Sequence, residues 1–302
     1  MEFTAQLLIT ILLDGLSYAS YLFIVSVGLT IVFGVMKILN VAHGAFYAWG
    51  AYCAAWSITL AGELGLPDWS GFILIFISAM VVGLILGVII EVLILRRLYE
   101  QDEVVIVLAT FGLFLVLEDI ILLVFGVDPF FAYQPTTVLG GVMIVGVFRD
   151  LYSVSLFFLA VVIAFGCWFG LTRTKWGKLI SVVIYDREAS LAMGINTKMV
   201  FLVIFVIGTM LGALGGAYVA PTLSVAPGFG IDIIVLSFAV VVIGGMGSIP
   251  GAIIGAGMVG IFRAATVHLL PELELFVVFA IMAVVLMIRP EGLFAPAQAR
   301  KI

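Results

Sequence analysis

The chain has 302 residues, of which 65% are hydrophobic and only 10% are charged, with a formal net charge of −5. Soluble domains hold roughly 45–50% apolar and about 25% charged residues, so a soluble protein of this length could not bury so much apolar surface. The apolar runs are too long and continuous for an outer-membrane barrel, whose segments of about ten residues alternate in polarity. The composition predicts an all-α polytopic membrane protein.

Nine apolar segments are long enough to enter a bilayer, whose core of about 30 Å requires roughly 20 helical residues. They cover about 5–33, 38–60, 71–95, 104–126, 151–171, 200–220, 231–246, 251–270 and 273–289. The seventh is short and ends in Gly-Gly-Met-Gly-Ser-Ile-Pro-Gly, which is typical of a broken or re-entrant element. We expect about eight to nine transmembrane or re-entrant helices in one membrane domain, residues 1–302.

The first segment carries a polar stripe. Asp14, Ser17, Tyr18 and Tyr21 stand at i, i+3, i+4 and i+7, on one face of a helix. An ionisable group at membrane depth costs about 2.5–3.5 kcal/mol on insertion scales and usually faces a cavity or a partner. Asp14 and Tyr18 are therefore candidates for lining a path. A structural hydrogen bond from Asp14 to a neighbouring helix explains the carboxylate equally well.

The second segment is interrupted by polar and small residues between positions 34 and 52. At steps of three and four it places Lys37, Asn40, His43 or Gly44, and Tyr47. Side chains of this kind satisfy backbone groups freed where a membrane helix breaks, and small residues let helices approach closely. We expect a broken-helix element near a gate. The alternative is packing alone, with Asn40 and His43 bonded between helices and Lys37 reaching the inner surface.

Three acids lie in the third and fourth segments. Glu91 precedes Arg96 and Arg97 by about one turn, which predicts an ion pair at the membrane interface. Glu118 and Asp119 are adjacent and diverge by about 100° on a helix, so at most one can point at a given partner. Both are expected to be hydrated near the outer end of their helix.

The longest charged stretch covers residues 172–199. From Leu179 to Met193, apolar and polar residues fall on helical spacing, and Gly194 is placed to end that helix. Such a loop is either a solvated connector or a docking helix for a cytoplasmic partner.

A second interruption follows the seventh segment. Its candidate gate residues are Gly245, Gly247, Ser248 and Gly251. The sequences of 43–50 and 250–257 share Gly-Ala-x4-Gly, which indicates either an internal repeat or the general abundance of glycine and alanine in packed membrane helices. Together with the 34–52 stretch, this interruption is expected to form a pair of broken helices near the gate.

Arg263 in the eighth segment is expected to pair with Asp232 or Glu118, or to extend toward the membrane surface, in preference to the alternative that it contacts the cargo.

The basic residues set the expected orientation, because short cytoplasmic loops are enriched in lysine and arginine. Eleven of the thirteen fall in regions that alternate consistently: Lys37, Arg96, Arg97, Arg173, Lys175, Lys178, Arg187, Lys198, Arg289, Arg300 and Lys301. Arg149 and Arg263 are the exceptions. This distribution predicts an external N-terminus and a cytoplasmic C-terminus.

Several blocks, in order, carry a family resemblance: GLTIVFGVMKILNVAHGAFYAWGAY, ATFGLFLVLEDIILLVFG, DREASLAMGIN, GALGGAYVAP, VVVIGGMGSIPGAIIGA and IRPEGLF. Together they resemble permeases of the branched-chain amino acid ABC transporter type, the LivH-type inner-membrane permeases, from about residue 7 to 295. The family implies a bacterial inner-membrane location and transport of branched-chain or other hydrophobic amino acids, with urea, short amides and small organic acids as alternative cargo.

The resemblance also implies partners: a second homologous permease, two cytoplasmic ATPases and an extracytoplasmic solute-binding protein, with no nucleic acid. ATP and Mg would be used by the ATPases, because this chain has no G-x-x-x-x-G-K-[ST] loop, and no cofactor is expected on the chain itself. By similarity to the E-A-A-x-x-x-G docking loop, the ATPase-docking residues are Asp186, Arg187, Glu188, Ala189, Ala192, Gly194, Ile195 and Asn196.

Two other function classes fit the sequence less well. An ion-coupled secondary carrier would use Asp14, Glu118 and Asp119 as coupling carboxylates but does not need a docking helix in residues 172–199. An enzyme is not supported, because no nucleophile–base grouping or metal-ligand spacing is legible.

Overall fold

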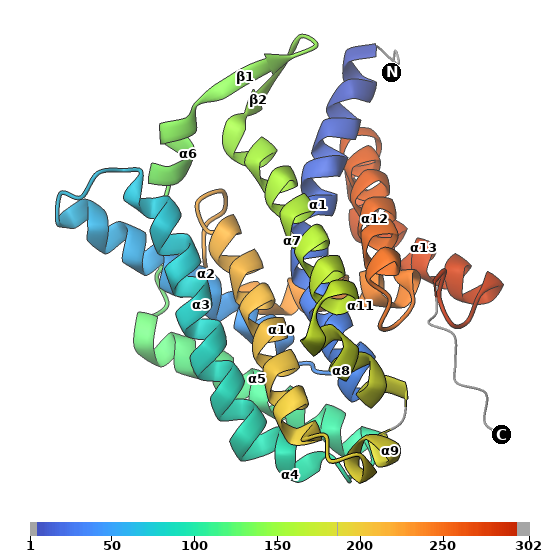
Figure 1. Ribbon diagram of the computed structural model, residues 1–302. Coiled ribbons are helices and arrows are strands. Elements are labelled where there is room, and N and C mark those ends of the chain that lie inside the picture. Colours follow the sequence, from blue (N-terminus) through green and yellow to red (C-terminus); the bar gives the residue numbers. More distant parts are fainter. Residues whose placement is uncertain (1–4, 186, 295–302) are drawn as a thin grey trace.

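The computed structural model describes residues 5–185 and 187–294, which form a bundle of long helices (Figure 1). Each of the nine predicted segments is a helix. They are α1 (Ala5–Met36), α2 (His43–Glu63), α3 (Ser70–Ile90), α5 (Glu103–Phe125), α7 (Leu151–Arg173), α10 (Thr197–Val219), α11 (Phe229–Gly244), α12 (Ile249–Leu269) and α13 (Glu274–Ile288). The predicted all-α polytopic class is confirmed.

Seven of the described helices are long and apolar enough to cross a membrane. The other two long helices each border an irregular segment: α2 follows one, and α11 precedes another. α11 has 16 residues, about 24 Å at 1.5 Å per residue, which is shorter than a bilayer core. α3 continues through a π-helical turn (Glu91–Leu95) into α4 (Arg96–Leu98).

α1 lies at the centre of the bundle, packed against α12, α10, α7 and α11, while α10 packs against α2 and α3. Small residues permit the α1–α12 contact: a Cβ on Gly15 would lie 2.9 Å from the Cα of Ile261, and one on Gly260 would lie 2.6 Å from the backbone nitrogen of Ala19. Such close approach is how helices associate in lipid, where apolar burial alone gives little driving force.

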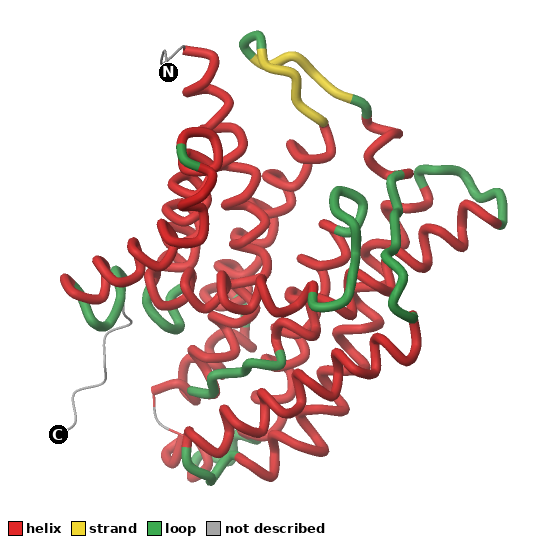
Figure 2. Tube along the Cα trace, turned by 180° about the vertical axis from the view of Figure 1, so that it is seen from behind, coloured by secondary structure: helices red, strands yellow, loops and turns green. Residues whose placement is uncertain are grey.

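One end of the bundle, called here the upper end, carries the N-terminal part of α1, α6 (Gln134–Leu139) and a hairpin of β1 (Gly141–Ile144) and β2 (Val147–Asp150) (Figures 1 and 2). The strands are antiparallel, with Ile144 opposite Val147. Positive φ at Val145 and Gly146 closes the two-residue turn. No pattern in the sequence predicted this hairpin.

The opposite, lower end carries α4, α8 (Lys175–Tyr185) and α9 (Arg187–Ala192) (Figure 1). The helix predicted over 179–193 corresponds to α8 and α9 within the described residues, and position 186 lies outside them.

A glycine ends α9, as predicted. The N–H of Gly194, at φ +79°, donates to the carbonyl of Leu191, and the N–H of Ile195 donates to the carbonyl of Ser190. This pair of bonds is the Schellman arrangement, which uses the left-handed conformation that glycine adopts without strain.

Candidate functional site

The predicted break in the second segment lies at residues 37–42, between α1 and α2. Lys37 has φ +57°, and α2 begins at His43, whose ring reaches Val25 in the middle of α1. The chain therefore turns back beside α1 before the second helix starts. Lys37 itself is exposed, with its ammonium 5.8 Å from the centre of the Phe33 ring.

Thr110 on α5 satisfies the backbone of this irregular segment. Its hydroxyl accepts from the N–H of Val41 at 3.2 Å, and its one proton faces two carbonyls, that of Val107 in its own helix at 3.0 Å and that of Leu39 at 3.3 Å. The Asn40 side chain accepts from the N–H of Ala42 at 3.1 Å. Irregular backbone at membrane depth requires such partners, because lipid offers none.

His43 is fully buried and donates from Nε2 to the carbonyl of Val25 at 2.9 Å. Glycines make room for its ring: a Cβ on Gly212 would lie 2.9 Å, and one on Gly28 3.0 Å, from the His43 Cε1 atom. Asn40 and His43 thus both support the break from within the protein. Among the residues that the structure describes, the Asn40 Nδ2 and His43 Nδ1 atoms have no hydrogen-bond partner.

The next two candidates pack against α11. A Cβ on Gly44 would lie 2.6 Å from the carbonyl oxygen of Gly230. Tyr47 stacks on Phe229 with ring centres 5.0 Å apart, and its hydroxyl accepts from Tyr21 at 2.7 Å.

The second predicted break covers residues 245–248, between α11 and α12. Gly245 and Gly247 have φ of +103° and +88°, and the Ser248 hydroxyl caps α12 by accepting from the N–H of Gly251 at 3.1 Å. Gly251 packs against Gly244 so closely that a side chain there would meet its backbone.

The two breaks lie near each other at the lower end. A Cβ on Gly34, near the end of α1, would be 3.1 Å from the Cα of Gly247. Lys37 and Leu39 from the first break and Met246 from the second line one cavity of about 520 Å³. More than 200 residues separate these segments in the sequence, and the fold brings them together.

The C-terminal block Ile-Arg-Pro-Glu-Gly-Leu-Phe holds the second break. Leu293 and Phe294 donate their N–H groups to the carbonyls of Ile243 and Gly244, at 3.0 and 2.9 Å. These are the free carbonyls at the end of α11, so the block acts as its cap.

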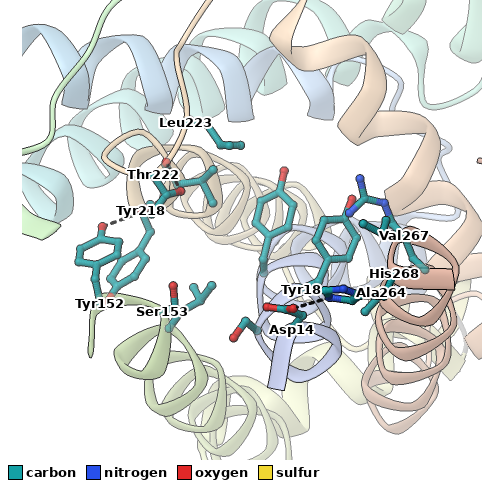
Figure 3. A pocket seen from close by; sticks show the side chains of 15 residues that line it. Asp14, Tyr18, Tyr152, Ser153, Tyr218, Thr222, Leu223, Ala264, Val267 and His268 are labelled. Carbon is teal, nitrogen blue, oxygen red and sulfur yellow. Dashed lines mark hydrogen bonds and ion pairs between the residues drawn. The ribbon is translucent and has the colours of Figure 1, made fainter. Parts of the chain in front are cut away.

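A cavity of about 390 Å³ lies between α1, α7, α10 and α12 in the upper half of the bundle. It is lined by Asp14, Ser17, Tyr18, Tyr21, Tyr152, Ser153, Leu156, Tyr218, Val219, Thr222, Leu223, Arg263, Ala264, Val267 and His268. Figure 3 shows Tyr152, Ser153 and Tyr218 on one side of this space, with Asp14, Tyr18 and His268 on the other.

Asp14 accepts from two partners at the cavity. Arg149 of β2 forms an ion pair with one of its oxygens, and Nε2 of His268 lies 2.7 Å from the other. The Asp14 side chain keeps 34% of its surface exposed. The structural hydrogen bond that the sequence analysis left open is therefore present, and the carboxylate also lines the cavity.

Arg263 pairs with Glu274, and neither of the partners expected from the sequence is used. The short 3₁₀ turn after α12 places the start of α13 beside the last turns of α12, so Glu274 is the nearest acid. The Arg263 guanidinium also lies 3.9 Å from the centre of the Tyr18 ring, a cation–π contact.

The far wall of the cavity is held by tyrosines. The Tyr152 hydroxyl donates to the carbonyl of Tyr218 at 2.6 Å, their rings stack with centres 4.7 Å apart, and Ser155 bonds the Tyr218 hydroxyl at 2.5 Å. Sequence reasoning missed Tyr152, Tyr218, Arg149 and Glu274. A signal existed for Arg149 alone, as a basic residue outside the expected cytoplasmic regions.

The acids of the third and fourth segments lie in different surroundings. Glu91 is buried and pairs with Arg96 at 2.9 Å, as predicted, and also accepts from the Tyr99 hydroxyl at 2.6 Å. Asp119 is exposed, whereas Glu118 is half-buried against α11 rather than hydrated. Within the described ranges, no three His, Cys, Asp or Glu side chains gather as metal ligands would.

The predicted docking residues that the structure describes lie at the lower end. Arg187, Glu188, Ala189 and Ala192 belong to α9, and Asp186 lies outside the described residues. Ile195 packs against the core, and the Asn196 side chain caps α10 by accepting from the N–H of Met199 at 3.1 Å.

Comparison with known proteins places these features in a family. The model of the family described as "Branched-chain amino acid transport system / permease component" matches residues 11–286. The permease protein BraD of Pseudomonas aeruginosa is 26% identical over 299 residues, covering 96% of this chain and 97% of its own. The permease protein LivH of Escherichia coli K12 is 26% identical and covers 96% of both chains.

A LivH protein of Methanocaldococcus jannaschii is 25% identical, covering 86% of this chain and 81% of its own. Among solved structures, PsaBC from Streptococcus pneumoniae in complex with Fab aligns with a TM-score of 0.49 and 14% identity, over 94% of this chain and 92% of that one. The family match spans nearly the whole helical bundle, so the chain belongs to the branched-chain amino acid transport permease family.

Proposed function

We propose that this chain is the membrane-crossing subunit of an ATP-binding-cassette importer for branched-chain amino acids or a related small solute. The observation that carries the proposal is the family match over residues 11–286. The curated relatives match over almost their full length, and their names describe permease proteins of branched-chain amino acid transport. A second homologous permease, two ATPases and an external solute-binding protein complete the proposed machine.

The lower end is the proposed ATPase-docking surface. α9 stands between α8 and α10 at this end, and Leu191 and Met193 expose 54% and 63% of their surface there. Exposed apolar side chains on a short helix, outside the lipid-length helices, support contact with a protein partner. Asp186, Arg187, Glu188, Ala189, Ala192 and Gly194 belong to this proposed surface by similarity to the docking loop. Ile195 and Asn196 position it.

The proposed orientation puts the lower end in the cytoplasm and the N-terminus outside. Arg96 and Arg97 of α4, and Lys175 and Lys178 of α8, lie at this end, while the hairpin and the start of α1 lie at the other. That separation supports the positive-inside assignment. The location proposed is a bacterial inner membrane.

The proposed translocation elements are the cavity around Asp14 and Tyr18, together with the two breaks. Asn40, His43, Gly44 and Tyr47 belong to the first break, and Gly245, Gly247, Ser248 and Gly251 to the second. The two breaks contact each other through the end of α1, and this contact supports the proposal that they move together when α9 moves. An ion-coupled carrier is less well supported, because Asp14 is already held by Arg149 and His268.

Two matched variants test the proposal. Met193 in the docking loop and Met143 in β1 are both 63% exposed, at opposite ends of the bundle. We expect Met193→Arg to abolish copurification of the ATPase with the permease in detergent and to abolish ATP-driven leucine uptake into proteoliposomes. Met143→Arg should retain copurification. Failure of the wild-type chain to bind any ATPase would remove the importer proposal, and unchanged behaviour of Met193→Arg would remove the docking surface.

A further inference from the structure

The short helix α8 follows α7, a helix whose apolar surface is open. α7 is long and apolar enough to cross a membrane, and few of its residues are buried in the chain. The open surface reaches the last turns of α7, where Phe165, Trp168 and Phe169 are exposed. Exposed apolar side chains on a helix of this length face the bilayer or another membrane-embedded surface. α8 therefore begins where an apolar surface of membrane depth ends.

The turn between α7 and α8 is fixed by hydrogen bonds and close packing. The Thr174 hydroxyl donates to the carbonyl of Gly170 at 2.6 Å and accepts from the N–H of Gly177 at 3.0 Å. A Cβ on Gly177 would lie 2.2 Å from the carbonyl oxygen of Leu171, so the first turn of α8 packs directly on the end of α7. α8 is thereby held at the lower end of the bundle, turned away from the axis of α7 (Figure 1).

Three stripes of residues run along α8, each with members at i, i+3 and i+6, on neighbouring faces of the helix. One stripe is buried against the bundle and consists of Gly177, Ile180 and Val183. The stripe beside it is apolar but exposed and consists of Trp176, Leu179 and Val182. The stripe beyond that is polar and exposed and consists of Lys175, Lys178 and Ser181. Around the helix, the surface thus passes from buried apolar to exposed apolar and then to basic.

This order of stripes is that of a helix in the interface of a bilayer. Such a helix buries its apolar residues at the boundary of the acyl chains and keeps its lysines among the headgroups. Trp176 has the kind of side chain that is enriched at that depth, since indole rings favour the membrane–water interface. Because α8 begins where the open apolar surface of α7 ends, lipid that covers α7 reaches α8 as well.

The charge of this part of the chain has one sign. Residues 151–185 contain Arg173, Lys175 and Lys178 and neither aspartate nor glutamate. The Arg173 guanidinium lies 5.7 Å from the centre of the Trp168 ring, so a cation and an indole stand together at the end of α7 as well. Basic residues beside a membrane-spanning helix attract anionic headgroups at the bilayer surface. The charge therefore favours anionic over zwitterionic lipid.

We propose that α8 lies in the bilayer interface at the lower end of the bundle and binds anionic phospholipids there. Trp176, Leu179 and Val182 contact the acyl chains, and Lys175 and Lys178 contact the phosphate groups. The inference concerns the lipid around the chain and depends neither on the solute nor on the ATPase. Since α9 follows α8 in the chain, lipid bound to α8 holds the proposed docking surface at the membrane.

The test uses the full-length chain, with the subunits that copurify with it, in nanodiscs of equal parts phosphatidylcholine and phosphatidylglycerol. Either the one lipid or the other carries brominated acyl chains, which quench the fluorescence of a tryptophan that they contact. The difference between the wild type and Trp176→Phe isolates the quenching of Trp176. We expect both lipids to quench Trp176, and brominated phosphatidylglycerol to do so at least about threefold more strongly.

Trp56 of α2 is the matched control, because Trp56 and Trp176 are both 49% exposed. Residues 38–95 contain no lysine or arginine, so the two lipids should quench Trp56 equally, as measured with Trp56→Phe. Lys175→Gln combined with Lys178→Gln should reduce the preference at Trp176 to about one while quenching by both lipids persists. A misfolded lysine variant would also change the quenching of Trp56, and this distinguishes misfolding from the loss of lipid binding.

Three results would overturn the proposal. If neither lipid quenches Trp176, the exposed apolar stripe of α8 is not in the bilayer interface. If quenching appears only after the copurifying subunits are removed, a protein partner covers the stripe instead of lipid. If both lipids quench Trp176 equally in the wild type, the two lysines do not select anionic headgroups.

Discussion

Asp14 and Arg149 are separated by 135 positions in the chain, and they form an ion pair between the central helix and the upper hairpin. Arg149 is one of two basic residues that break the positive-inside pattern, and the other, Arg263, pairs with Glu274. Both exceptions are therefore neutralised within the chain. The orientation stays a proposal that rests on the other eleven basic residues.

The first prediction concerns this pair. Asp14→Asn and Arg149→Gln should each destabilise the chain, because each leaves one charge without its partner. The Asp14 side chain is 34% exposed, so solvent screening limits the coupling to about 1 kcal/mol. Unfolding of the two single variants and the double variant in mixed micelles measures it. Effects that add within about 0.5 kcal/mol would mean that the pair is not energetically coupled.

Local spacing predicted the features that depend on neighbouring residues. The nine apolar helices, the Glu91–Arg96 pair and the end of α9 at Gly194 all follow from contacts within a few residues. The partners of Asp14 did not follow, since His268 lies 254 positions away and Arg149 on a hairpin that was not predicted. Helical periodicity gives the face on which a residue lies but not the helix that covers it.

The second prediction concerns Thr110, whose hydroxyl serves two backbone groups of the first break. Thr110→Val keeps the shape but leaves the Val41 N–H and the Leu39 carbonyl without that partner, at a cost of about 1–3 kcal/mol. Thr209→Val is the control, because the Thr209 hydroxyl is equally buried but bonds only the carbonyl four residues earlier in its own helix. Melting temperatures in nanodiscs compare the two. Equal losses would show that Thr110 does not support the break.

The third prediction concerns the space around His43. Gly212→Ala adds a Cβ 2.9 Å from the His43 ring and should cost about 1–3 kcal/mol through overpacking. Gly112→Ala is the control, because a Cβ at that position in α5 meets nothing within 4 Å. It should be neutral or slightly stabilising, since alanine is the better helix former. The same melting assay applies, and an unchanged Gly212→Ala would contradict a fixed His43 ring.

The two breaks share a short sequence pattern but are stabilised in different ways. The first uses Thr110 and Asn40, whereas the carbonyls before the second are capped by Leu293 and Phe294. The Gly-Ala-x4-Gly pattern opens a helix after a break in both places, and the resemblance does not extend to the groups that hold each break. The repeat remains a hypothesis from the sequence.

The fourth prediction tests the second break as part of a gate. Gly251→Val places a side chain against the backbone of Gly244, where α11 ends, and would hold the two helix ends apart. Gly257→Val, six residues further along α12, meets nothing within 4 Å and is the matched control. We expect ATP-driven leucine uptake per assembled complex to fall at least about tenfold for Gly251→Val and to stay at the wild-type rate for Gly257→Val.

Uptake must be normalised to the complex that assembles, because overpacking at Gly251 also costs about 1–3 kcal/mol of stability. A variant that assembles less but transports at the wild-type rate per complex has lost stability alone, and that outcome would reject the gate. A variant that assembles fully yet transports slowly places the defect in movement of the break.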